Sequence, residues 1–158
     1  MREVLIDLKA FKENLKYIKE KAGVPVLAVV KADAYGHGLV PCAKAASEAG
    51  ADYLGTALLE EAFTIREAGI KTPLLAWLNP PGLDYAKAVA QNIEIGVASL
   101  AAFDEVNAIA GANCIERKEC CASAVGAFQK RNRGFCHVPR FNHHVLQLTT
   151  DGRFDGHF

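Results

Sequence analysis

The feature that most constrains the fold is a strand and helix pattern that repeats four times within the first 110 residues. Short apolar runs typical of buried strands end at Lys31, Ala57, Leu78 and Ser99, at intervals of 26, 21 and 21 residues. A segment with helical spacing follows each run, and right-handed crossovers make the strands of such units parallel. The pattern predicts an α/β fold, a partial (β/α)8 TIM-type barrel of about four strand-helix units. The alternative is an open four-stranded sheet of the flavodoxin type.

Local signals place the individual elements. Asp7 suits a helix N-cap, and the glycines at 23, 50 and 69 suit helix ends. The segment between Lys31 and Gly38 is expected to be a glycine-bearing loop. The sequence predicts strands at 26–30, 53–57, 73–78 and 93–98, and helices at 8–21, 39–49, 58–68, 83–91 and 99–110.

Composition excludes several classes of protein. The 158 residues include 18 basic and 18 acidic side chains, so bulk charge favours neither nucleic acid nor an anionic membrane as a partner. No apolar stretch approaches the roughly 20 residues of a membrane span, and the start lacks a signal-peptide core, which predicts a cytoplasmic location. Five cysteines, an odd count, favour reduced thiols, and Cys42 is expected to be a small buried residue.

The residues after position 110 differ in kind from those before it. They hold four of the five cysteines and four of the five histidines, and they carry 7 basic and 4 acidic side chains, against 11 and 14 in residues 1–110. No sustained helical face is present. We therefore expect 111–158 to be an atypical, poorly ordered tail, as a frameshifted reading or an unrelated fusion would produce. Its cysteine spacings do not fit a structural zinc site, so no metal is predicted.

Lys31 is the strongest candidate for chemistry. It follows the apolar run 25–30, at the carboxyl end of a predicted buried strand, where active-site groups of parallel α/β folds lie. Desolvation there favours a neutral amine, which Schiff-base chemistry requires. A strand-end lysine that extends into solvent is the alternative.

The residues after Lys31 favour a binding site. Gly36 and Gly38 allow backbone to approach a ligand closely, and the phenol of Tyr35 can reach a bound anion. Gly38 also precedes a predicted helix whose first amides could bind phosphate.

Residues 29–38, Val-Val-Lys-Ala-Asp-Ala-Tyr-Gly-His-Gly, resemble the cofactor-lysine motif of the alanine racemases, which are pyridoxal-phosphate-dependent barrel enzymes. The segments 6–8, 53–57, 60–62 and 97–99 resemble the same family in the same order. The resemblance covers residues 1–110, which would then be the N-terminal half of the cofactor-binding barrel.

The resemblance implies specific roles. Lys31 would hold pyridoxal 5'-phosphate and act as the catalytic acid and base on one face of the substrate α-carbon. Tyr35 would contact the cofactor phosphate, and Trp77 would pack near the cofactor, with a core tryptophan as the alternative. His37 is expected to support the loop. The reaction would interconvert L- and D-alanine, supplying D-alanine for peptidoglycan, in a homodimer.

The same resemblance indicates what the sequence does not contain. In this family the second base is a tyrosine from the carboxy-terminal domain of the partner subunit, and no residue here matches it. We therefore expect this chain to be a truncated, inactive form. Two alternatives stay open: a racemase of broader specificity, acting on serine, lysine or arginine, and a non-catalytic pyridoxal-phosphate-binding barrel protein.

Overall fold

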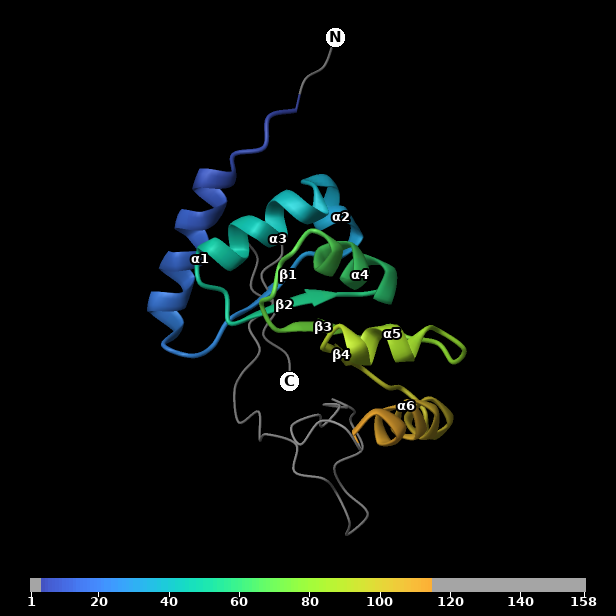
Figure 1. Ribbon diagram of the computed structural model, residues 1–158. Helices are drawn as coiled ribbons and strands as arrows, with labels where there is room; N and C mark the ends of the chain where they lie inside the picture. The colour runs from blue at the N-terminus through green and yellow to red at the C-terminus, as the bar shows by residue number, and fades with distance from the viewer. Residues whose placement is uncertain (1–3, 115–158) are drawn as a thin grey trace.

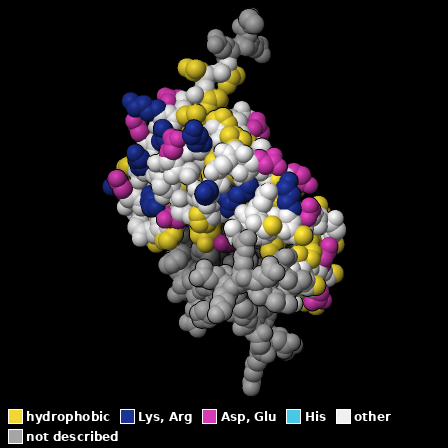
Figure 2. All heavy atoms as spheres, viewed as in Figure 1, with side chains coloured by type: hydrophobic (Ala, Val, Ile, Leu, Met, Phe, Trp, Pro, Cys, Tyr) yellow, Lys and Arg dark blue, Asp and Glu magenta, His cyan; other side chains and the backbone are white. Residues whose placement is uncertain are grey.

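A computed structural model of the chain describes residues 4–114. The predicted tail therefore lies, from residue 115 onward, outside the described residues, as do the predictions made for its order and its cysteines. Among residues 4–114, no helix is both long and apolar enough to cross a membrane. Basic and acidic side chains are interspersed over the face shown in Figure 2, without a patch of single sign in the described part.

Four parallel strands lie side by side in the order in which they occur in the chain (Figure 1). Residues Leu54, Leu74 and Ile93 of neighbouring strands stand in register. A flavodoxin-type sheet reverses its order partway, so this consecutive order excludes that alternative and confirms the partial barrel. The strands are β1 (Leu27–Val29), β2 (Tyr53–Thr56), β3 (Leu74–Ala76) and β4 (Ile93–Ile95).

The helices begin and end close to where the sequence places them. Asp7 caps the first helix by accepting hydrogen bonds from the amides of Lys9 and Ala10, both at 2.9 Å, and Gly23 ends it with a left-handed φ of 63°. Asp84 caps the fifth helix in the same way. The helices are α1 (Leu8–Ala22), α2 (Lys31–Gly36), α3 (Leu39–Glu48), α4 (Leu59–Glu67), α5 (Tyr85–Ala90) and α6 (Leu100–Cys114).

The sheet has two chemically different faces. Helices α3, α4 and α5 contact one face, while α1 packs outside on α3 (Figure 1). Ala28, Leu54 and Leu74 of that face join buried helix residues in a single apolar core. Cys42, only 2% exposed, belongs to this core, as predicted. Alternation along each strand turns the intervening residues to the opposite face, which lines the interior of a closed barrel. That inner face carries Leu27, Val29, Gly55, Leu75, Trp77 and Glu94.

One segment differs from its prediction. Residues 31–36, expected to form an open loop, form the helical turn α2 directly at the end of β1. The conformation of this turn determines how Lys31 is presented.

Candidate functional site

Lys31 lies at the carboxyl end of β1, where the sequence predicts it. Its side chain is half-buried, and its Nζ lies 5.7 Å from the centroid of the Trp77 ring. Trp77 follows β3, so its indole must cross β2 to approach an amine at the end of β1. The structure therefore brings together two residues that are 46 positions apart in the sequence.

Two glycines make room for this crossing. A Cβ on Gly55 of β2 would lie 2.5 Å from Trp77 Cζ3 and 2.7 Å from Leu27 Cδ2. A Cβ on Gly96, just after β4, would lie 2.8 Å from the Cα of Trp77. Real Cβ atoms do not approach other atoms this closely, so both positions require glycine. The sequence analysis did not identify their role, although a glycine within a strand is a known signal of close approach.

The turn α2 is left-handed. Ala32, Asp33, Ala34 and Tyr35 all have φ between 51° and 57°. The amide of Ala34 donates to the carbonyl of Val30 at 2.9 Å, and that of Gly38 donates to Asp33 at 2.9 Å. Left-handed helical backbone costs about 1–2 kcal/mol per non-glycine residue, so tertiary contacts must hold the turn.

Three side chains make those contacts. Oε1 of Glu61 accepts the amide hydrogen of Ala32 at 2.6 Å, and Oδ1 of Asp33 accepts that of Leu39 at 2.7 Å. Nδ1 of His37 lies 2.9 Å from the carbonyl oxygen of Ala34 and must be the donor, because a carbonyl can only accept. His37 thus supports the segment as expected, while the contribution of Glu61 was not foreseen.

The first turn of α3 is less suited to phosphate than the sequence suggests. The amide of Leu39 is taken by the Asp33 carboxylate, and Pro41 has no amide hydrogen. A side-chain anion already occupies the position that a bound anion would take at this helix end. The anion-binding role expected for these amides is therefore not supported.

Tyr35 is the last of the four left-handed residues. Its side chain is 39% exposed, and its hydroxyl has no hydrogen-bond partner among residues 4–109. A phenol in this position is available to a ligand.

The inner face also carries a polar pair that the sequence analysis missed. Tyr53 of β2 and Glu94 of β4 are hydrogen-bonded through their side chains. Burial, together with the Glu94 carboxylate, raises the pKa of Tyr53 to about 12. Burial also raises the pKa of Glu94 above its ordinary value, although its hydrogen bond to Tyr53 opposes this shift. The pair places a polar group inside the barrel, at a position where the sequence indicates only buried strands.

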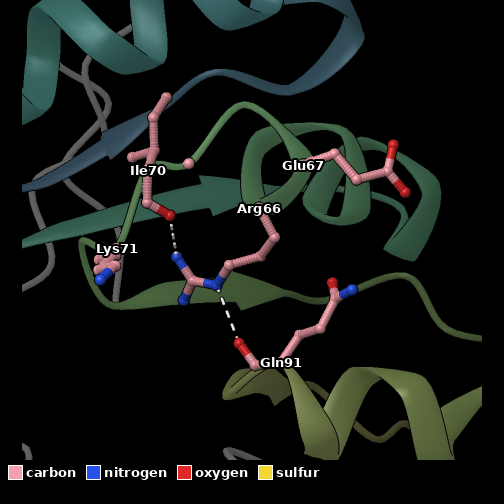
Figure 3. A pocket seen from close by; sticks show the side chains of 6 residues that line it. Arg66, Glu67, Ile70, Lys71 and Gln91 are labelled. Atoms are coloured by element: carbon pink, nitrogen blue, oxygen red, sulfur yellow. Dashed lines mark hydrogen bonds between the residues drawn. The ribbon is translucent and has the colours of Figure 1, made fainter.

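A shallow hollow lies at the other end of the sheet (Figure 3). The Arg66 side chain extends along it and donates to the carbonyls of Ile70 and Thr72, both at 2.8 Å, Gln91 at 3.0 Å and Asn92 at 2.9 Å. These carbonyls precede β3 and β4, so the hollow faces away from Lys31. Because the guanidinium is saturated by backbone, Arg66 joins two loops and is not available to a ligand.

Comparison with known proteins agrees with this arrangement. The family model described as "Alanine racemase, N-terminal domain" matches residues 6–118. The chain belongs to the alanine racemase family. The motif resemblance noted in the sequence is thereby confirmed over well beyond half of the chain.

Individual relatives give the extent of the similarity. The chain is 48% identical over 104 residues to the alanine racemase of Salinispora tropica, which covers 66% of this chain and 28% of the relative. It is 49% identical over 109 residues to that of Mycolicibacterium smegmatis, covering 68% and 28%. The chain therefore spans somewhat more than a quarter of the length of these relatives.

Solved structures show the same relationship. The alanine racemase from the D-cycloserine-producing Streptomyces lavendulae superimposes with a TM-score of 0.66 at 46% identity, covering 68% of this chain and 28% of that one. The Bacillus anthracis alanine racemase, solved with bound L-Ala-P, gives a TM-score of 0.60 at 40% identity, covering 66% and 28%. The four strand-helix units are thus part of an alanine racemase barrel.

Proposed function

We propose that this chain supplies the cofactor-lysine part of a pyridoxal-phosphate-dependent racemase that interconverts L- and D-alanine. The observation that carries the proposal is the half-buried Lys31 at the end of β1, with its Nζ 5.7 Å from the centroid of the Trp77 ring. An amine beside an aromatic face, with an unpartnered phenol on the same turn, fits a flat heteroaromatic aldehyde that bears a phosphate.

The chain's residues would divide the work as follows. Lys31 would hold the cofactor covalently through Nζ, and the same nitrogen would move the α-proton at one face of the substrate. When bound, the cofactor supplies the electron sink that makes this proton acidic. Tyr35 would donate its hydroxyl hydrogen to the phosphate, and the Trp77 indole would pack against the bound ring.

The 158-residue polypeptide is expected to racemise alanine poorly on its own, because racemisation needs a second proton-transfer group on the opposite face. The chain has four tyrosines, all within the described part. Tyr53 is bonded to Glu94, and the Tyr85 hydroxyl donates to Pro80 at 2.7 Å. Tyr17 lies on α1, outside α3, and Tyr35 is assigned to the phosphate. A homodimer with further sequence would complete the site, and D-alanine for peptidoglycan in the cytoplasm would be its product.

A chimera tests the function directly. Residues 4–114 would replace the matching part of the Streptomyces lavendulae enzyme, and conversion of L- to D-alanine would be measured. We expect racemisation that Lys31→Ala abolishes. A folded chimera without activity would contradict the proposal. Faster turnover of serine, lysine or arginine than of alanine would favour a racemase of broader specificity.

Cofactor attachment can be tested on the 158-residue chain. The protein would be incubated with pyridoxal 5'-phosphate, reduced with borohydride and mapped by peptide mass spectrometry. We expect the adduct on Lys31 in preference to surface lysines such as Lys9. An unlabelled Lys31 would contradict the proposal for this polypeptide, whereas labelling with an inactive chimera would favour a non-catalytic binding protein.

A further inference from the structure

Glu61 connects the end of β2 to the turn that carries Lys31. Its Oε2 accepts hydrogen bonds from the amides of Ala57 at 3.0 Å and Leu58 at 3.1 Å, at the start of α4. Its Oε1 accepts the amide of Ala32 at 2.6 Å. One carboxylate therefore binds three backbone amides from two loops, at the same end of the sheet.

The amide of Ala32 is the one whose fixation matters most for Lys31. It belongs to the peptide that directly follows Lys31, and Ala32 is the first left-handed residue of α2. The other side chains that hold the turn act further along, Asp33 through Leu39 and His37 through Ala34. Among the described side chains, only Glu61 holds the turn at its first residue.

We propose that Glu61 is the positioning residue that keeps the Lys31 turn left-handed and so directs the Lys31 amine toward Trp77. This inference rests on the proposed function only for the identity of what Lys31 binds. Without the bond to Glu61, Ala32 would relax toward the right-handed or extended backbone that an alanine prefers. The Cα–Cβ bond of Lys31 would then turn, and its long side chain would amplify the change at Nζ.

The chemistry of the three bonds explains why a carboxylate is needed. Three N–H donors converge on two oxygens, and a carboxylate accepts at both. A glutamine accepts at its oxygen only, and its NH2 group would face a donor on the other side. Because two of the donors lie on the Oε2 side, the glutamine oxygen is expected to settle there. Glu61→Gln should therefore keep the start of α4 and release Ala32.

The experiment compares Glu61→Gln with Glu60→Gln in the full chain. Glu60 is the preceding residue, is exposed and lies in the first turn of α4, so its replacement removes the same charge from the same helix end. Amide hydrogen exchange would be followed at Ala32, Ala57 and Leu58, with Ala28 and Leu54 as reporters of the core. Binding of pyridoxal 5'-phosphate and its borohydride trapping on Lys31 would be measured in parallel.

We expect Glu61→Gln to speed exchange at Ala32 at least tenfold, leave the core amides unchanged, and weaken attachment to Lys31 about tenfold. Glu60→Gln should change neither quantity. Unchanged exchange at Ala32, or acceleration throughout the core, would overturn the proposal, since the second result describes general destabilisation. Unchanged attachment to Lys31 despite a released Ala32 would also overturn it. If wild-type Lys31 takes no cofactor, the proposed function fails, and exchange at Ala32 alone decides whether Glu61 holds the turn.

Discussion

At the scale of single residues, Gly55 controls how closely the Trp77 side chain can approach Lys31. The indole lies over the position where any other residue of β2 would carry its Cβ. Burying a large aromatic ring against bare backbone gains contact area that no branched strand residue would allow. The absence of a side chain at Gly55 is thus part of the site, as much as the amine and the ring are.

Gly55→Ala should therefore displace the ring and destabilise the protein. Because the added Cβ would lie 2.5 Å from Trp77 Cζ3, we expect a loss of about 1–3 kcal/mol in the free energy of unfolding. The chain has a single tryptophan, so the emission spectrum reports on Trp77 alone and should shift. In a Trp77→Leu background the same substitution should cost less. An equal cost in both backgrounds would show that the ring is not the obstacle.

Asp52 gives the stability a dependence on acid pH. Its carboxylate accepts from Lys19 Nζ and from the amide of Val26, both at 2.8 Å. Burial acts to raise the pKa of Asp52, but the bonds from Lys19 and Val26 outweigh it, so the pKa is lowered below its ordinary 3.8. A carboxyl whose pKa is lower in the folded state stabilises the fold above its unfolded-state pKa. That contribution is lost as the pH falls through the folded-state value.

We expect the free energy of unfolding to decrease as the pH falls below about 4, and Asp52→Asn to flatten this part of the profile. Urea titrations over a series of pH values would measure it. Asp104→Asn, at an exposed aspartate of α6, serves as the matched control. A wild-type slope that survives in Asp52→Asn would assign the acid dependence to other carboxylates.

At the scale of elements, the boundaries that the sequence predicts correctly are those with a local cause. Asp7 and Asp84 bind the first amides of their helices, and Gly23 and Gly69 adopt the left-handed backbone that ends a helix. Continuous apolar runs mark the strands because both faces of the sheet are buried. For the same reasons the parallel order could be predicted from spacing alone.

The left-handed hand of α2 could not be predicted, because its cause is not local. Alanine and tyrosine disfavour positive φ, and the glycines of the segment lie after the four strained residues. The contact that fixes Ala32 comes from Glu61, 29 positions away. The crossing of Trp77 over Gly55 is likewise a tertiary contact. Lys31 could be singled out from sequence, whereas the arrangement that directs it could not.

Arg66 joins elements at the opposite end of the sheet, and its replacement should be costly. Its guanidinium binds four backbone carbonyls, and burial lowers its pKa below the ordinary value without removing its charge. Arg66→Met keeps an unbranched apolar stem but leaves those carbonyls without their donor. We expect a loss of about 2–4 kcal/mol in the free energy of unfolding, measured with urea. Lys71→Met, at an exposed lysine lining the same hollow, should cost little; equal costs would contradict the assignment.

At the scale of the whole molecule, the sheet has two edges within the described residues. β1 is paired only with β2, and β4 only with β3. A complete barrel closes on itself and has no edge strands, so the matching strands of full-length relatives pair on both sides. Open edges present rows of N–H and C=O groups that can pair with another chain.

The 158-residue polypeptide is therefore expected to self-associate through these edges. In sedimentation velocity its average mass should rise with protein concentration, since edge pairing between copies satisfies backbone groups that a monomer leaves to water. The chimera proposed above is the matched control, because it carries the same four strands in a complete barrel and should give one discrete species. A polypeptide that stays monomeric at all concentrations and unfolds in one cooperative transition would contradict the expectation. Such a result would mean that the edges of β1 and β4 are satisfied within a single copy of the chain.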